Sequence, residues 1–100
     1  MLIKFDEHIV LTKSREGGRL AKENFLPILS SASPERKVVF DFDGVKTISS
    51  SFADEFFGKV IGDIGFEIFK SKTTFMNLNP FVSNVIKNSV YHRNSDQFQK

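Results

Sequence analysis

The stretch Lys37-Val-Val-Phe-Asp-Phe-Asp-Gly-Val-Lys-Thr-Ile-Ser-Ser-Ser-Phe-Ala-Asp-Glu-Phe-Phe-Gly58 decides how this chain folds. Its first part, Val38–Phe42, is apolar on both faces, as expected for a strand in the middle of a sheet. The pair Asp43-Gly44 that follows is a strong turn signal. Ser51-x-x-Asp54 has the form of a capping box with Asp in place of Glu. The stretch therefore predicts a buried strand, a turn, and a helix that opens beside consecutive serines.

The predicted helix is strongly amphipathic and ends near two glycines. Apolar residues at helical spacing cover one side, namely Phe52, Ala53, Phe56, Phe57, Val60 and Ile61. We expect Gly62 and Gly65 to end this helix. Phe66–Lys70 is expected to form a short extra turn.

The segments before this stretch predict further strands and one more helix. Leu2–Leu11 alternates loosely, and the charged residues inside it predict two short paired strands or one strand with a break. Ser14 is a suitable N-cap for a helix that runs to about Ser30. Pro27 should kink that helix or mark its last turn, because proline removes a donor from the helix.

The last part of the chain predicts a strand and a helix. Thr73–Leu78 reads as a strand, and Asn79-Pro80 as an N-cap followed by proline at the first helical position. The buried side of this helix is expected to hold Phe81, Val82, Val85, Ile86 and Val90. Residues 94–100 have too little apolar content to order themselves, so we expect a frayed tail there and a single domain over residues 1–93.

The predicted order is strand, strand, helix, strand, helix, strand, helix (β-β-α-β-α-β-α). Helices between strands require crossover connections, which are right-handed in nearly all known cases. The expected fold is therefore α/β, with a four-stranded, mostly parallel mixed sheet and amphipathic helices packed on it.

Composition narrows the function classes. The chain has 100 residues, and phenylalanine supplies 12 of its 13 aromatic side chains, which predicts a core filled by phenylalanine. It has no cysteine, and His8 and His92 lack metal-ligand spacing, so we expect no metal and no cofactor. The net charge of +2 is too small to predict nucleic-acid binding. No apolar run has membrane-spanning length and no signal peptide is recognisable, so a cytoplasmic location is expected.

The chain resembles the bacterial STAS-like domain family of unknown function. Ile48–Gly58 is similar to that family's hallmark, and Ser14-Arg15, Asn77-Leu78-Asn79 and Tyr91-His92-Arg93 are similar to its recurring positions. The resemblance covers about residues 9–93, so a STAS-like fold is implied. Such domains are related to the STAS domains of anti-sigma factor antagonists.

In those antagonists a strand is followed by Asp-Ser-Ser-Gly, and a partner kinase phosphorylates the first serine. Ser50 falls on that phosphoacceptor and Ser51 keeps its serine, while Ser49 replaces the aspartate and Phe52 the glycine. The implied partner is a histidine-kinase-like ATPase that acts as a serine kinase.

These observations predict a non-catalytic regulatory domain that docks a protein partner and is switched by phosphorylation of Ser50. The expected docking residues are Ser49, Ser51, Phe52, Asp54, Glu55 and Arg15. Two alternatives stay open. The serines could serve only as helix caps, and the domain could bind its partner independently of phosphorylation.

A second resemblance concerns Asp41 and Asp43. Val38–Val45 is similar to the first motif of haloacid-dehalogenase-type phosphatases, in which the first aspartate attacks phosphorus, the second is an acid/base, and Mg²⁺ neutralises charge. That chemistry also needs a downstream acidic pair that closes a strand, and none follows Asp43 here. We therefore expect no enzymatic activity and keep a Mg²⁺-dependent phosphohydrolase as the alternative.

Overall fold

Three parallel strands form the sheet of this protein. The structure, a computed structural model, describes the backbone of residues 1–98 and the side chains of residues 1–90. Strands β1 (Leu2–Lys4), β2 (Val38–Asp41) and β3 (Thr73–Met76) lie in the order β1-β2-β3, and both pairings are parallel. The apolar segment Val38–Asp41 is therefore the central strand, as its sequence predicted.

The expectation of four strands in a mixed sheet was wrong at the N-terminus. Leu2–Lys4 is the only strand there, and the chain then forms two 3-10 turns, η1 (Phe5–His8) and η2 (Leu11–Lys13). The side chain of Phe5 is fully buried, and its ring stacks on Phe42 with the centroids 4.6 Å apart. Burying this ring turns the backbone toward the core, so the charged residues after it cannot continue a strand.

The helices follow the predicted order, with more detail than the sequence indicated. The first is α1 (Arg15–Ser31). The second is one continuous helix made of three segments, α2 (Ser50–Ala53), η3 (Asp54–Gly58) and α3 (Lys59–Ile64). The last two are α4 (Phe66–Lys72) and α5 (Pro80–Phe98). Segment η3 is a π-helical turn. Pro27 lies inside α1, which continues to Ser31, and the predicted extra turn after Gly65 is the helix α4.

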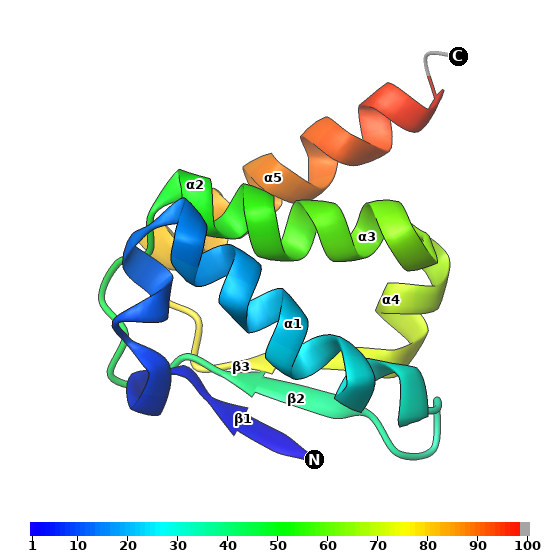
Figure 1. Ribbon diagram of the computed structural model, residues 1–100, viewed down its shortest axis with the longest axis horizontal. Helices are drawn as coiled ribbons and strands as arrows, with labels where there is room; N and C mark the ends of the chain where they lie inside the picture. The colour runs from blue at the N-terminus through cyan, green and yellow to red at the C-terminus, as the bar shows by residue number, and fades with distance from the viewer. Residues whose placement is uncertain (99–100) are drawn as a thin grey trace.

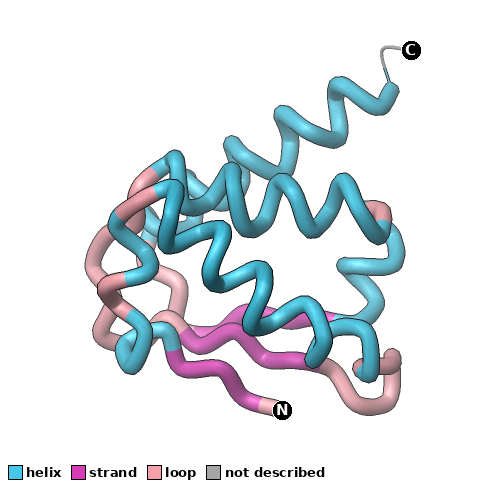
Figure 2. Tube along the Cα trace, in the orientation of Figure 1, coloured by secondary structure: helices cyan, strands magenta, loops and turns pink. Residues whose placement is uncertain are grey.

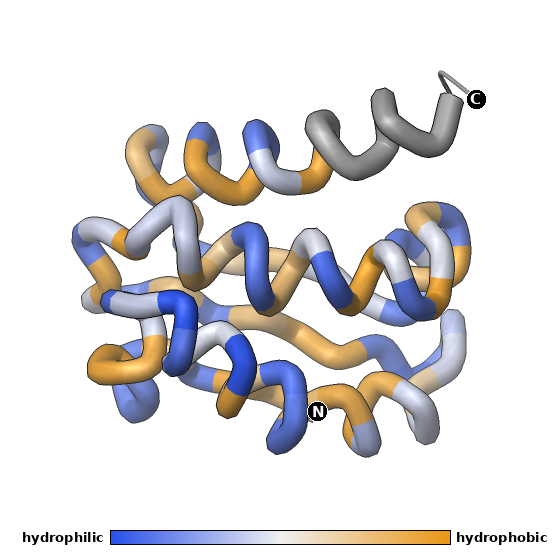
Figure 3. The backbone as a smooth tube through the Cα atoms, turned by 45° about the horizontal axis from the view of Figure 1, so that its top comes forward, coloured by the Kyte–Doolittle hydropathy of each residue, from blue (hydrophilic) through white to orange (hydrophobic). Residues whose placement is uncertain are grey.

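All these helices lie on one side of the sheet (Figures 1 and 2). On the opposite face Leu2 and Met76 are 50% and 45% exposed. The inward face carries Ile3, Phe40 and Phe75, which are aligned across the three strands. Hydrophobic and hydrophilic residues alternate along α1 and along the helix from α2 to α3, as amphipathic packing requires (Figure 3).

The core between sheet and helices is built from phenylalanine, as composition predicted. Phe40 and Phe57 are fully buried with ring centroids 5.8 Å apart in an edge-to-face pair. Other buried rings are Phe5, Phe25, Phe42, Phe52, Phe56 and Phe69. Offset and edge-to-face ring pairs add to the stabilisation that burial alone provides.

Helix α5 begins where the sequence predicted. The side-chain Oδ1 of Asn79 accepts a hydrogen bond from the Val82 backbone N–H at 2.7 Å, so Asn79 is the N-cap. The helix continues to Phe98, past position 93, where we expected the ordered domain to end. Gln99 and Lys100, the end of the expected tail, lie outside the described residues.

Candidate functional site

The serine run lies at the start of helix α2, and its first member is the N-cap. The Phe52 backbone N–H donates to Ser49 Oγ at 3.0 Å, and Ser49 has extended backbone angles. The predicted capping box of Ser51 and Asp54 was therefore wrong by two residues. The N-cap is the residue whose side-chain hydroxyl accepts a hydrogen bond from the backbone N–H three residues later, and here that residue is Ser49 rather than Ser51.

Two separate segments hold the chain that leads into Ser49. The Ser49 backbone N–H donates to the carbonyl of Thr12 at 2.9 Å, and the Thr12 hydroxyl donates to the carbonyl of Ile9 at 2.7 Å. Asn79 Nδ2 donates to the carbonyls of Val45 and Lys46 at 3.1 and 2.9 Å. The loop before the serines is thus tied both to η2 and to the start of α5.

Helix α1 packs closely against this helix opening. A Cβ added to Gly18 would lie 2.8 Å from both the Phe52 carbonyl oxygen and Glu55 Cβ, so the close approach depends on glycine. Beside it, Arg15 Nη1 donates to Glu55 Oε1 at 3.0 Å. Two expected docking residues, Arg15 and Glu55, are therefore joined by an ion pair across the two helices.

The remaining expected docking residues differ in exposure. Ser50 is exposed, while Ser49, Ser51 and Asp54 are half-buried. Phe52 is fully buried in the phenylalanine core and has no surface to offer a partner, so its assignment to the docking surface was wrong. Its position in α2 directs the ring inward, since residues 52, 53, 56, 57, 60 and 61 share the apolar side of the helix.

A hollow of about 360 Å³ opens at this corner and includes residues that the sequence alone did not indicate. Arg15, Ser50, Ser51 and Asp54 line one side of it. Helix α5 closes the other side with Val85, Asn88 and Ser89. Nothing in the sequence singled out Asn88 and Ser89, because polar residues recur along α5. We call the surface formed by these seven residues the serine corner.

Asp41 lies at the end of β2 and does not line the serine corner. Its Oδ1 accepts hydrogen bonds from Asn77 Nδ2 and from the Asp43 backbone N–H, both at 2.9 Å. The Asn77 amide, then the Asp43 N–H and the charge of Lys4, hold the pKa of the Asp41 carboxyl below its usual range, while burial acts in the opposite direction. Asn77 itself has a positive φ of 59°. Asp41 thus joins the turn after β2 to the turn after β3.

Asp43 is exposed, and it contacts Asp41 through its backbone N–H. Among residues whose side chains are described, no group of three or more His, Asp and Glu could hold a metal ion. Within the same part of the chain, no helix has the length and hydropathy needed to cross a bilayer. The side chains of Tyr91, His92 and Arg93 lie outside the described residues.

Comparison with known proteins places the chain in a family. Neither the curated proteins nor the solved structures contain a significant match to it. The model of the STAS-like domain of unknown function matches residues 19–82, which include β2, the three serines and β3 but not Ser14, Arg15 or Tyr91–Arg93. This chain therefore belongs to the family of STAS-like domains of unknown function.

Proposed function

We propose that this protein is a regulatory interaction domain that docks a protein partner at the serine corner. The observation that carries this proposal is the exposed hydroxyl of Ser50 in a hollow formed by three helices. The hollow has mixed chemistry, with the charges of Arg15 and Asp54, an amide, hydroxyls and the apolar Val85. Such a surface suits a partner with a polar, specific contact region.

Phosphorylation of Ser50 is the switch in this proposal. A phosphoserine carries nearly two negative charges, which would repel an acidic partner and add a strongly hydrated group to the interface. Within the corner it would attract Arg15, which is now paired with Glu55. Competition for Arg15 would loosen a contact between α1 and η3, so one modification would change both the charge and the shape of the surface. The kinase implied by the family resemblance is a histidine-kinase-like ATPase in the cytoplasm.

A phosphorylation-independent interaction module is the second candidate. Ser49 is a structural cap and Arg15 already has a carboxylate partner. The corner is therefore complete without a phosphate, and docking through the unmodified surface needs no switch.

The experiment that tests the proposal begins with capture of the partner from native lysate and mass spectrometry of the serine run. The captured partner is then titrated with purified wild type, Ser50→Asp and Ser50→Ala. We expect Ser50→Asp to weaken binding by about tenfold or more, because like charges brought together at an interface cost several kcal/mol. Ser50→Ala should bind like the wild type, because removing the Ser50 hydroxyl breaks no described contact.

The matched control is Asn24→Asp, which adds the same charge at an exposed position of α1. Equal affinities of wild type, Ser50→Asp and Asn24→Asp would refute docking at the serine corner. Weaker binding of Ser50→Asp without phosphate on Ser50 in the native protein would favour the phosphorylation-independent module.

A further inference from the structure

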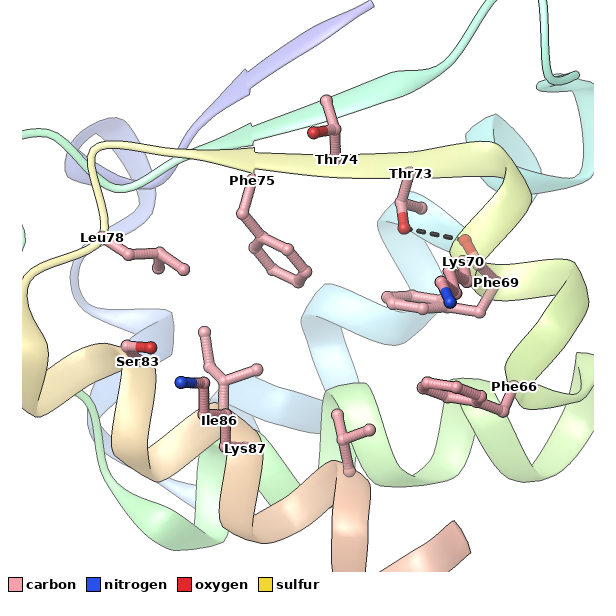
Figure 4. Close-up of a pocket in the computed structure, with 11 residues that line it drawn as sticks. Phe66, Phe69, Lys70, Thr73, Thr74, Phe75, Leu78, Ser83, Ile86 and Lys87 are labelled. Carbon is pink, nitrogen blue, oxygen red and sulfur yellow. Dashed lines mark hydrogen bonds between the residues drawn. The ribbon is translucent and has the colours of Figure 1, made fainter.

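A second hollow, of about 350 Å³, lies between β3, α4 and α5 (Figure 4). Its walls are mostly apolar and are formed by Phe66, Phe69, Phe75, Leu78, Ile86 and Val90. Phe69 and Ile86 belong to the buried core, so the floor of the hollow is continuous with the interior of the protein. Water gains few hydrogen bonds there, and filling the hollow with apolar atoms would be favourable.

The rim of this hollow is positively charged. Lys70 from α4 and Lys87 from α5 line it, and among the residues whose side chains are described no acidic residue does. Both lysines are exposed, and among the described residues neither forms an ion pair with a carboxylate. Nearby Lys72 differs, because its Nζ donates to the carbonyl of Leu29 at 3.4 Å. Two ammonium groups are thus available to an anion held at the rim.

Shape and charge together define the ligand. At about 30 Å³ per water-sized group, the volume accommodates roughly 12 non-hydrogen atoms. An apolar chain of that size would fill the space between the rings, and an anionic head would reach the lysines. We propose that this hollow binds a medium-chain carboxylate of about ten carbons. This site shares no residue with the serine corner and goes beyond the proposed docking function.

The test uses decanoate below its micellar concentration, with decanol as the uncharged probe and acetate as the head group alone. Binding is followed by calorimetry and by methyl shifts of Leu78, Ile86 and Val90. We expect saturable decanoate binding with those methyl groups shifted, weaker decanol binding, and no acetate binding. Equal affinities for decanoate and decanol, shifts spread over the surface, or no saturation would overturn the proposal.

Variants separate the head contact from the chain contact. Each exposed ion pair is worth about 0.2–1 kcal/mol, so the loss of two in Lys70→Met with Lys87→Met should weaken decanoate binding by roughly twofold to thirtyfold. Lys59→Met on α3 lies outside the hollow and is the matched control, with unchanged affinity expected.

Ser83→Phe fills the space beside Leu78 and Ile86 and should abolish decanoate binding. A circular dichroism spectrum like that of the wild type checks that this variant folds. Decanoate binding that survives in folded Ser83→Phe would overturn the assignment. So would a loss of affinity in Lys59→Met as large as that in the variant with Lys70→Met and Lys87→Met. So would an apolar protein segment that binds here while decanoate does not.

Discussion

Gly17→Ala should destabilise the protein even though alanine favours helices. Gly17 lies in the first turn of α1 and its backbone N–H donates to Ser14 Oγ at 3.0 Å. A Cβ at this position would lie 1.9 Å from the carbonyl oxygen of Leu11. Ordinary contacts between carbon and other heavy atoms lie near 3.5–4.0 Å, so the start of α1 and η2 would have to separate.

Whether Gly17→Ala stabilises or destabilises the protein depends on two opposing contributions to the free energy of unfolding. Replacing glycine by alanine inside a helix gains about 1 kcal/mol at most. Overpacking a closed contact typically costs about 1–3 kcal/mol, and the upper end applies when the obstacle is backbone rather than a flexible side chain. We therefore expect a net loss of roughly 1–2 kcal/mol in the free energy of unfolding.

Gly62→Ala provides the matched control. Gly62 lies in α3, and a Cβ added there would meet no heavy atom within 4 Å. This variant should gain roughly 0.5–1 kcal/mol. Urea unfolding of both variants measures the difference. Stabilisation of Gly17→Ala to the same extent as Gly62→Ala would show that α1 and η2 do not approach as closely as described.

Two further predictions concern Ser49, the N-cap of α2, and Asp41, at the end of β2. Ser49→Ala removes the cap of α2 and should cost about 1 kcal/mol of unfolding free energy in urea titration, whereas Ser51→Ala, which caps nothing, should cost clearly less. The Asp41 carboxyl has a lowered pKa in the folded state, so its contribution to stability is present above the unfolded value of about 3.9 and is lost as the pH falls through the folded pKa. The stability difference between wild type and Asp41→Asn should therefore be present at pH 7 and shrink as the pH falls from about 4 toward the lowered folded pKa, and a constant difference across this range would contradict the assignment.

Local patterns were enough to predict most of the secondary structure. The apolar run Val38–Phe42 predicted the central strand, because such runs are typical of strands in the middle of a sheet. Asn79-Pro80 predicted the start of α5 because a cap and a proline act on their own neighbours. The phenylalanine core followed from composition in the same way.

The failures arose where distant contacts decide the conformation. The turn at Phe5–His8 forms because Phe5 packs on Phe42, a partner 37 positions away that periodicity does not reveal. The serine corner was predicted from one segment, but Asn88 and Ser89 join it only through the packing of α5 on α2. The burial of Phe52, in contrast, was indicated by helical spacing, and only its assignment to the docking surface was wrong.

Helix α5 borders both hollows and raises the question of whether they influence each other. Val85, Asn88 and Ser89 face the serine corner, whereas Ser83, Ile86 and Lys87 face the apolar hollow.

Val82, which lines neither hollow, is fully buried, and the Asn79 cap fixes the start of the helix. Because the helix is anchored at its start and along its buried side, we expect changes on its two faces to be independent. Ser50→Asp is therefore expected to leave the dissociation constant of decanoate unchanged. It should also add to Ser83→Phe in unfolding free energy within about 0.5 kcal/mol, because separated sites without shared contacts behave additively. A larger deviation would show that α5 shifts as a unit and carries coupling between the two hollows.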